Sequence, residues 1–482
     1  MMRGMLKKIV VLLGCLLLTT QPLWSQEEAA FPETDLEMEP SSPSDTFPET
    51  AEFEEDEAFD AFSLDEQSGL NLEMDSSESE GASSWIDQLL AASRFTLKHE
   101  ISYKTEEPEG IVNNRDSIRL EFSRFFWNTF FLQFDTKLSV YWGNDHRGEA
   151  RSDDEDPLLE TSSKEAFLQA SIGDTSIKAG IQVMVWGESD GGAITDVISP
   201  RDYSELFFIS LEESRIGQAM AVMDQFSDWG QWSLFYIPEP EFNEYPEEGS
   251  AYDIDPFEGM AEFQDSTSDK ALDEYGLRWK KTVGKSDLAI MAASLIENDY
   301  AYRLDGYTSS GKLLLTKTRQ RFTMVGLTFN FVSGQFLYKG ELARKSPQSF
   351  NDEAYQIVKK DVTDLALGIE YASGGSYTLG LEAVNSHIHD WEETIQGVEE
   401  NTTSLVISWS KSFLNEELDV NWTSSTSRPY VAYFHSLKTS YDWNDHITIE
   451  LEAFYPDVPD EENSYYPYRD QKQIALKTQL QF

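Results

Sequence analysis

The chain has 482 residues, and its 87 Asp and Glu side chains outnumber 37 Lys and Arg, which gives a formal net charge of −50 at pH 7. A protein this acidic does not attract a polyphosphate, so nucleic acid is excluded as an expected partner. After the N-terminus no apolar run approaches the roughly 18 residues that a membrane-spanning helix needs, so a helical membrane protein is excluded as well.

The first segment, residues 1–25, is predicted to be a secretory signal peptide. It begins with basic side chains, continues with the apolar run Ile9–Leu18 and ends on a small-residue cleavage site at Ser25. Cys15 also ends a stretch that resembles a lipobox, but cleavage there would leave a very short apolar run. Cleavage near Ser25 removes the single cysteine, so we expect no disulfide and no thiolate metal site in the mature chain.

Residues 26–82 are predicted to form a disordered, acidic periplasmic extension. Between Glu27 and Glu80 the sequence has 20 carboxylates and no Lys or Arg. Such a stretch repels itself and buries too little apolar surface to offset the entropy of ordering. An alternative is a tail that docks on a basic partner or in a basic lumen through its spaced aromatic rings. These rings are Phe31, Phe47, Phe53, Phe59 and Phe62. Residues 83–93 are expected to form one short amphipathic helix.

From Arg94 to the end, apolar and polar residues alternate with period two, which is typical of strands with one apolar and one polar face. In the segment 129–142, for example, Phe130, Leu132 and Phe134 share one face. The pattern predicts strands near residues 94–105, 115–125, 129–142, 164–172, 175–186, 215–225, 230–238, 272–281, 286–298, 319–331, 335–345, 361–372, 376–387, 402–412, 416–425, 430–441, 445–455 and 470–482.

The connections between these strands alternate between tight turns and, mostly, long polar loops. This arrangement is typical of a transmembrane β-barrel with its turns on the periplasmic side. We therefore predict an all-β fold over residues 94–482, an antiparallel meander of about 18 strands, with 16 as the alternative, closed into an outer-membrane barrel of a diderm bacterium. A soluble propeller or solenoid is the competing architecture, but it would carry a repeat of fixed length, which the sequence lacks.

Aromatic residues make up 13% of this polar chain and gather near the predicted strand ends. Rings with an apolar body and a polar tip suit the headgroup level of a membrane. The residues concerned are Tyr141, Trp142, Trp186, Tyr236, Trp279, Trp409, Trp422, Tyr441 and Trp443. The terminal Phe482 resembles the C-terminal signal that barrel-assembly machinery reads, so this machinery and the lipids of the outer membrane are expected partners.

Charged residues on the polar faces are predicted to line the lumen. The basic set is Lys98, Arg119, Lys137, Lys178, Arg278, Lys280, Lys339 and Lys477. The acidic set, from the later strands, is Asp364, Glu370, Glu382, Glu417, Asp419, Glu450 and Glu452. Two arrangements remain open: the sets face each other across the bore and create a transverse field, or inward charges pair locally and fill the bore. Local partners for the basic wall are Glu100, Glu121, Asp135 and Glu341.

The segments 178–189 and 196–204 resemble a domain-of-unknown-function family of outer-membrane β-barrel proteins, similar in style to the alginate-export porins. The residues that carry the resemblance are Gln182, Trp186, Gly187, Glu188, Ser189, Pro200 and Asp202. Ile181 and Ser199 stand where members of the family have Arg and Asn. The resemblance implies a role in envelope export. The loop that follows contains apolar residues, so we expect it to fold into the bore or onto the rim, with packing among the outer loops as the alternative.

One catalytic pattern, G-x-S-x-G at Gly187–Gly191, lacks the helix that a nucleophile elbow requires. His387 and His389 beside Asp390 are interpreted as polar loop residues and not as a metal site. We therefore expect no enzyme and no cofactor. The hypothesis is a channel that passes or exports a polar or amphipathic solute. The alternative is a plugged barrel whose acidic tail docks a periplasmic or inner-membrane export partner.

Overall fold

The computed structural model describes residues 92–126, 129–151, 157–189, 192, 194–205, 211–253, 257, 259–265 and 272–482. All of these belong to one compact unit, Phe62–Phe482. The segments predicted to be the signal peptide and the acidic extension, and residues 83–91 of the expected short helix, lie outside the described residues. The predicted end of this helix at residue 93 is wrong, because Ser93 is the first residue of β1. Among the described residues no helix has the length and apolar character to cross a membrane.

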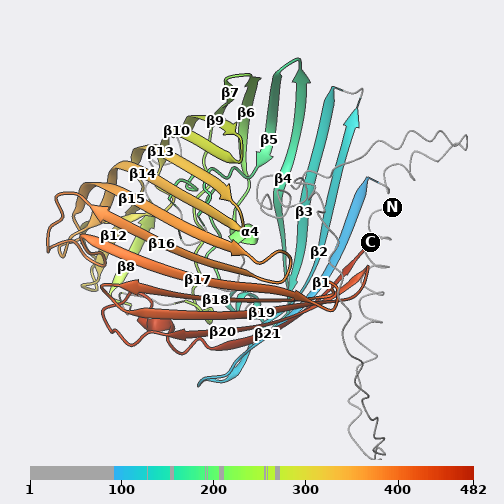
Figure 1. The fold of residues 1–482 in the computed structure, drawn as a ribbon. Helices are drawn as coiled ribbons and strands as arrows, with labels where there is room; N and C mark the ends of the chain where they lie inside the picture. The colour runs from blue at the N-terminus through green and yellow to red at the C-terminus, as the bar shows by residue number, and fades with distance from the viewer. Residues whose placement is uncertain are drawn as a thin grey trace, which may run out of the picture. The chain divides into compact units, whose positions relative to one another are not determined.

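Eighteen strands pair antiparallel in chain order and close into a barrel (Figure 1). The closure is made by β1 and β21, whose backbones pair from Thr96 with Gln481 to Lys104 with Gln473. The barrel strands are β1 (Ser93–Lys104), β2 (Gly110–Phe126), β3 (Phe130–Tyr141), β4 (Leu158–Ile172), β5 (Thr175–Gln182), β6 (Gln218–Ser227), β7 (Gly230–Ile237), β9 (Glu274–Val283), β10 (Ser286–Ile296), β13 (Arg321–Ser333), β14 (Phe336–Asn351), β15 (Ile357–Ala372), β16 (Thr378–Ile388), β17 (Asn401–Phe413), β18 (Leu418–Arg428), β19 (Ala432–Asn444), β20 (Ile447–Asp457) and β21 (Gln473–Gln481). The predicted fold class and the strand number of 18 are confirmed.

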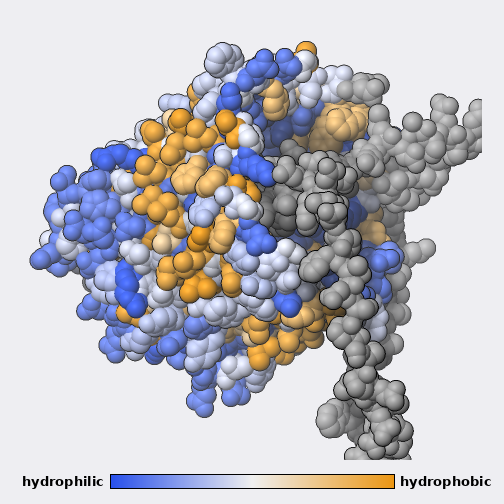
Figure 2. All heavy atoms as spheres, in the orientation of Figure 1, coloured by the Kyte–Doolittle hydropathy of each residue, from blue (hydrophilic) through white to orange (hydrophobic). Residues whose placement is uncertain are grey.

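Alternate residues along each strand face outward, and most of these are apolar and exposed. Leu367 on β15 is 51% exposed although it sits in the middle of a strand. Other outward residues of this kind are Leu168, Ile177, Met223, Leu234, Leu277, Ile290, Val325, Leu342, Leu381, Ile407, Leu437, Leu451 and Leu476. Figure 2 shows such residues gathered over the strands of the visible face. An apolar surface this extensive is costly in water and suits a lipid environment.

Aromatic side chains collect at the ends of the strands that are joined by tight turns. Phe331 stacks on Tyr338 with ring centroids 5.1 Å apart, and Phe336 lies at the same distance from Tyr371. Two members of the predicted set do not belong to such a girdle. Trp186 is 2% exposed and Tyr141 is 6% exposed, because both lie inside the barrel.

The loops at the other end hold the remaining elements. A three-stranded sheet is formed by β8 (Ala261–Asp265), β11 (Ala301–Tyr307) and β12 (Leu313–Thr318), in which β8 and β12 run parallel. Short helices are α3 (His146–Arg151), α4 (Leu211–Ser214) and the 3-10 helix η3 (Tyr466–Tyr468). The sequence pattern does not predict this sheet, because its strands are short and because β8 pairs with β12, a strand that is distant from it in the chain.

Candidate functional site: an inward loop and a polar lumen

The inward loop is the segment between β5 and β6, of which residues 183–189, 192, 194–205 and 211–217 are described, and these run along the inner wall of the barrel. Trp186, Ile194 and Ile198 of this loop are buried in one hydrophobic cluster with inner-face residues of the wall, and the rings of Trp186 and Phe235 meet edge to face at 5.3 Å. The wall residues of the cluster are Met220, Val222, Phe235, Ile237, Ala289, Met291, Ala293, Leu295, Phe322, Met324, Ala343 and Ala366. The hypothesis that the loop folds into the bore is therefore the one that the structure supports. Residues 206–210, whose apolar side chains suggested it, lie outside the described residues.

The inward turn explains why β5 ends at Gln182 and not at the predicted residue 186. The backbone N–H of Met184 donates to the hydroxyl of Ser199 at 2.8 Å, so it is no longer available for a neighbouring strand. The side-chain amide of Gln182 donates to the carbonyl of Met220 at 3.1 Å. These bonds turn the chain away from the sheet at the start of the family motif.

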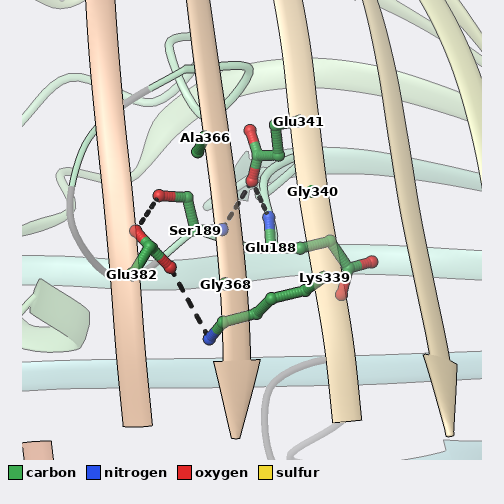
Figure 3. A pocket seen from close by; sticks show the side chains of 8 residues that line it. All are labelled: Glu188, Ser189, Lys339, Gly340, Glu341, Ala366, Gly368 and Glu382. Atoms are coloured by element: carbon green, nitrogen blue, oxygen red, sulfur yellow. Dashed lines mark hydrogen bonds and ion pairs between the residues drawn. The ribbon is translucent and has the colours of Figure 1, made fainter.

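Glu341 on β14 anchors the first half of the loop (Figure 3). Its carboxylate accepts hydrogen bonds from the backbone N–H groups of Glu188, Ser189 and Thr195 and from the hydroxyl of Thr195. Glu341 is 2% exposed, so these donors replace the water that a buried carboxylate loses. The sequence predicts Glu341 only as a local partner for lumen cations, and the structure gives it a different role.

A second anchor lies beside the first in Figure 3. The hydroxyl of Ser189 donates to Glu382 on β16 at 2.6 Å, and Glu382 also lies 3.9 Å from the ammonium of Lys339. Lys339 forms its shorter ion pair with Glu370, at 2.7 Å. A Cβ at Gly368 would come within 2.8 Å of the Lys339 side chain, so glycine leaves room for this lysine to lie across β15.

The environment of Ser189 is that of an anchor and not of a nucleophile. A nucleophilic serine gives its proton to a base, and backbone N–H groups nearby point toward the developing oxyanion. Here the Ser189 hydroxyl donates to Glu382, and the N–H groups of Glu188 and Ser189 both bind Glu341. These donors are therefore occupied by the barrel wall.

The second half of the loop is held by charges and backbone bonds. Asp196 accepts from Arg201 at 2.9 Å and from Arg215 at 3.1 Å, which links the two ends of the segment. A Cβ at Gly187 would come within 2.8 Å of the Asp196 side chain, so only glycine fits this close approach. Asn298, two residues after β10, donates to the carbonyl of Val197 at 2.9 Å.

The motif residues Pro200 and Asp202 pair the two limbs of the loop through their backbones. The carbonyl of Pro200 accepts from Ile216 at 2.8 Å, and the N–H of Asp202 donates to Ser214 at 2.6 Å. Residues 200–202 and 214–216, on either side of the undescribed residues 206–210, are therefore paired through their backbones.

A buried polar cluster fixes the loop to β2. Arg115 binds Asp145 at 2.9 Å and also the carboxylate of Glu205, which lies 3.6 Å from His146. Burial alone would raise the pKa of Glu205, but the charge of Arg115 and the neighbouring His146 side chain outweigh it and hold this pKa well below its usual value. The side chain of Glu205 is 3% exposed, so its pairing with Arg115 is a strong constraint on the loop.

The rest of the inner wall, from β15 to β21 and on to β5, is polar. Many predicted lumen residues are brought together there as ion pairs, one within β1 and the others between neighbouring strands. These pairs are Lys98–Glu100 (3.4 Å), Lys477–Glu452 (3.0 Å), Lys477–Glu100 (3.6 Å), Arg119–Asp135 (2.5 Å), Lys438–Glu450 (3.0 Å) and Lys345–Asp364 (2.8 Å). Cations and carboxylates thus alternate around this arc. Of the two predicted arrangements of lumen charges, these positions show local pairing.

The other predicted lumen residues are distributed as follows. Lys178 lies on the inner face of β5, 5.8 Å from the ring of Phe167, and Arg278 and Lys280 share the inner face of β9. Asp419 on β18 accepts from Ser412 at 2.6 Å. The prediction for Glu417 is wrong: this residue lies in the exposed turn before β18, because the strand begins at Leu418, two residues later than the predicted residue 416.

Several residues of the site have no signal in the sequence. Arg115, Glu205 and Thr195 come from segments far apart in the chain, and only the closed barrel brings them near their partners. The sequence does contain a signal for the apolar inner face of β6, β7, β10 and β13, because these strands are apolar on both faces. Inward residues such as Met220, Val222, Met291 and Met324 alternate there with outward apolar residues. A strand with two apolar faces indicates that another segment of the protein covers its inner face, as the inward loop does here.

A model of the family described as "Protein of unknown function (DUF1302)" matches residues 134–473. No curated protein matches the chain. Among solved structures the chain is similar to Pseudomonas aeruginosa OpdK with vanillate (TM-score 0.48, 9% identity, 82% of this chain and 99% of that one) and to Acinetobacter baumannii OccAB2 (TM-score 0.47, 9% identity, 81% and 97%). It is also similar to Salmonella typhi OmpF in complex with daunomycin (TM-score 0.41, 11% identity, 81% and 97%).

Proposed function

Because this chain belongs to the DUF1302 family of proteins of unknown function and closes 18 strands into a barrel, we propose that it is a channel in the outer membrane of a diderm bacterium. The apolar outer face contacts lipid, and the C-terminal strand is the part that assembly machinery reads. A polar or amphipathic solute passes by diffusion along the lumen, in the direction of export.

One observation carries this proposal: residues on the inner face of the polar arc are open to solvent. Asn421 and Thr423 on β18 are exposed, although the outward residue between them is Trp422. Ser162 on the inner face of β4 is exposed as well. Since the inward loop covers the hydrophobic cluster of the inner wall, the solvent-filled path lies between the loop and the polar arc.

The lining of this path favours a polar solute. Serine, threonine and asparagine hydroxyl and amide groups alternate there with the ion pairs described above, so a solute exchanges bonds with water for bonds with the wall at little cost. The inward loop narrows the bore, which favours passage of small or extended molecules.

A second candidate is a plugged barrel that docks an export system through its acidic extension. The observation that favours it is the firm attachment of the loop, which binds Glu341 through four donors and buries Trp186. In this case the barrel would anchor a periplasmic or inner-membrane partner without conducting.

Conductance of the refolded mature chain in a planar bilayer tests the two candidates. Thr423→Cys adds one thiol on the inner face, and Ser424→Cys adds one on the outer face as a matched control. We expect a charged methanethiosulfonate reagent to reduce the conductance of Thr423→Cys and to leave Ser424→Cys unchanged. A chain that is folded, as judged by heat-modifiable migration, but silent in the bilayer would support the docking candidate and overturn the channel.

A further inference from the structure

The inward loop places a carboxylate in the polar arc of the lumen. Glu213 belongs to α4, the last turn of the loop before β6, and lies 3.9 Å from the ammonium of Lys98 on β1. Its side chain is 41% exposed, in contrast to 3% for Glu205 in the same loop. Glu205 is therefore locked into the protein, whereas Glu213 faces the solvent of the lumen.

Cations on five consecutive strands interact electrostatically with this carboxylate, and the ammonium of Lys98 is in ion-pair contact with it. Lys98 lowers the pKa of Glu213 most strongly, burial opposes this, and Lys137, Lys164 and Lys477 add to the lowering, which brings the pKa to about 2. Arg119 on β2, between Lys98 and Lys137, also interacts with it. These cations come from β21, β1, β2, β3 and β4, which are neighbours in the barrel.

The structure of the wall positions these cations in two ways, through a β-bulge and through ion pairs. The register of β3 and β4 shifts beside Asp135, and the extra residue on β4 is Lys164. A bulge of this kind redirects a side chain that would otherwise alternate with its neighbours. Lys98 and Lys477 are shared with Glu100 on the wall, at 3.4 and 3.6 Å, so the wall itself holds these ammonium groups in place.

We propose that these lysines form the solute-binding site of the lumen, that the solute carries a carboxylate, and that Glu213 occupies the position of that carboxylate in this structure. The proposal rests on the channel proposed above and names its solute class. A carboxylate on a solute offers the same charge and the same oxygen acceptors as Glu213, so it forms equivalent charge-assisted bonds. Binding of the solute and of Glu213 at one site is mutually exclusive, and the loop thereby lowers the affinity of the lumen for the solute.

The test uses gluconate as a carboxylate probe and sorbitol as its neutral counterpart. In bilayers, Glu213→Gln is expected to lower the half-blocking concentration of gluconate at least about fivefold, in the range of coupling between competing ligands, and to leave the effect of sorbitol unchanged. Adding Lys137→Gln to Glu213→Gln is expected to reverse the gain. Glu262→Gln, on β8 in the outer loops, is the control for a lost carboxylate elsewhere.

Calorimetric titration of the refolded variants with gluconate separates this proposal from the channel itself. If gluconate binds more tightly to Glu213→Gln but the refolded protein does not conduct, the carboxylate site is supported and the channel is overturned. Conductance with the same gluconate affinity in Glu213→Gln and the unaltered chain overturns the carboxylate site alone. Equal responses to gluconate and sorbitol also overturn it.

Discussion

Thr195 donates both its backbone N–H and its hydroxyl to the carboxylate of Glu341, at 3.1 and 2.7 Å. The two residues are 146 positions apart in the chain. Thr195 lies on the inward loop and Glu341 on the inner face of β14, so this pair of bonds connects the family motif to the barrel wall. The first half of the loop is therefore attached to the wall through a carboxylate that accepts hydrogen bonds from three of its residues.

Glu341→Gln is expected to release the first half of the loop. The amide of glutamine would place an N–H group among N–H donors, and each buried donor left without an acceptor costs about 1–3 kcal/mol. We expect single-channel recordings to show a larger and more variable conductance than for the unaltered chain. Glu262→Gln serves as the control, and a conductance identical to that of the unaltered chain would contradict the anchoring role.

Trp186→Ala is expected to detach the loop through lost packing. Removing a buried aromatic side chain typically costs about 3–5 kcal/mol, because a cavity remains against Phe235 and its neighbours. Arg201 and Arg215 lie in this loop and are part-buried with Asp196, so trypsin should cut after them faster in the variant. Trp186→Phe keeps most of the packing and should be cut at nearly the original rate. Equal cleavage of all three proteins would show that the loop does not depend on Trp186.

The barrel could be predicted from the sequence because lipid imposes the same rule on every strand. Outward positions such as Leu365 and Leu367 must be apolar, so the period of two persists through each strand and fixes its face. The inner face obeys no such common rule. Met291 and Phe322 are apolar because the inward loop covers them. Asn421 is polar because it is exposed to water. One sequence shows the alternation but not which part of the inner wall is covered.

The candidate site could be predicted only in part for the same reason. The motif around Trp186 and Ser189 was recognisable as a unit, and its inward fold was one of two alternatives. Its contacts with Glu341 and Glu382 join segments more than 150 residues apart, and no local pattern encodes them. The role of Glu213 likewise depends on five strands that meet only when the barrel closes.

Glu205→Gln should lower stability in a pH-dependent way. The pKa of Glu205 is held well below its unfolded value of 4.5, because Arg115 and His146 outweigh the effect of burial. Its contribution is therefore complete above pH 4.5 and is lost as the pH falls further toward the folded pKa. Breaking a buried pair costs about 3–5 kcal/mol, so urea unfolding at pH 7 should differ strongly between variant and unaltered chain, and this difference should shrink below pH 4.5.

The control for this pH series is Glu106→Gln. Glu106 pairs with Lys472 at 2.8 Å on the exposed rim, where solvent screens the charges. Its unfolding curve should stay close to that of the unaltered chain at every pH. If Glu205→Gln behaved in the same way as Glu106→Gln, the buried cluster around Arg115 would not hold the loop.

Phe482→Ala should impair assembly more than it impairs the finished barrel. The rings of Phe482 and Phe95 stack at 6.3 Å, and their backbones exchange hydrogen bonds of 2.8 and 3.0 Å where the last strand meets the first. The backbone bonds remain in the variant, so a barrel once closed should unfold at a similar urea concentration. The amount of heat-modifiable protein in outer-membrane fractions should fall several-fold if assembly machinery reads the terminal ring.

Phe226→Ala removes an exposed ring at the end of β6 and should not lower that amount, since this residue lies outside the C-terminal strand. Equal amounts of both variants would mean that Phe482 acts only as one more aromatic residue of the rim.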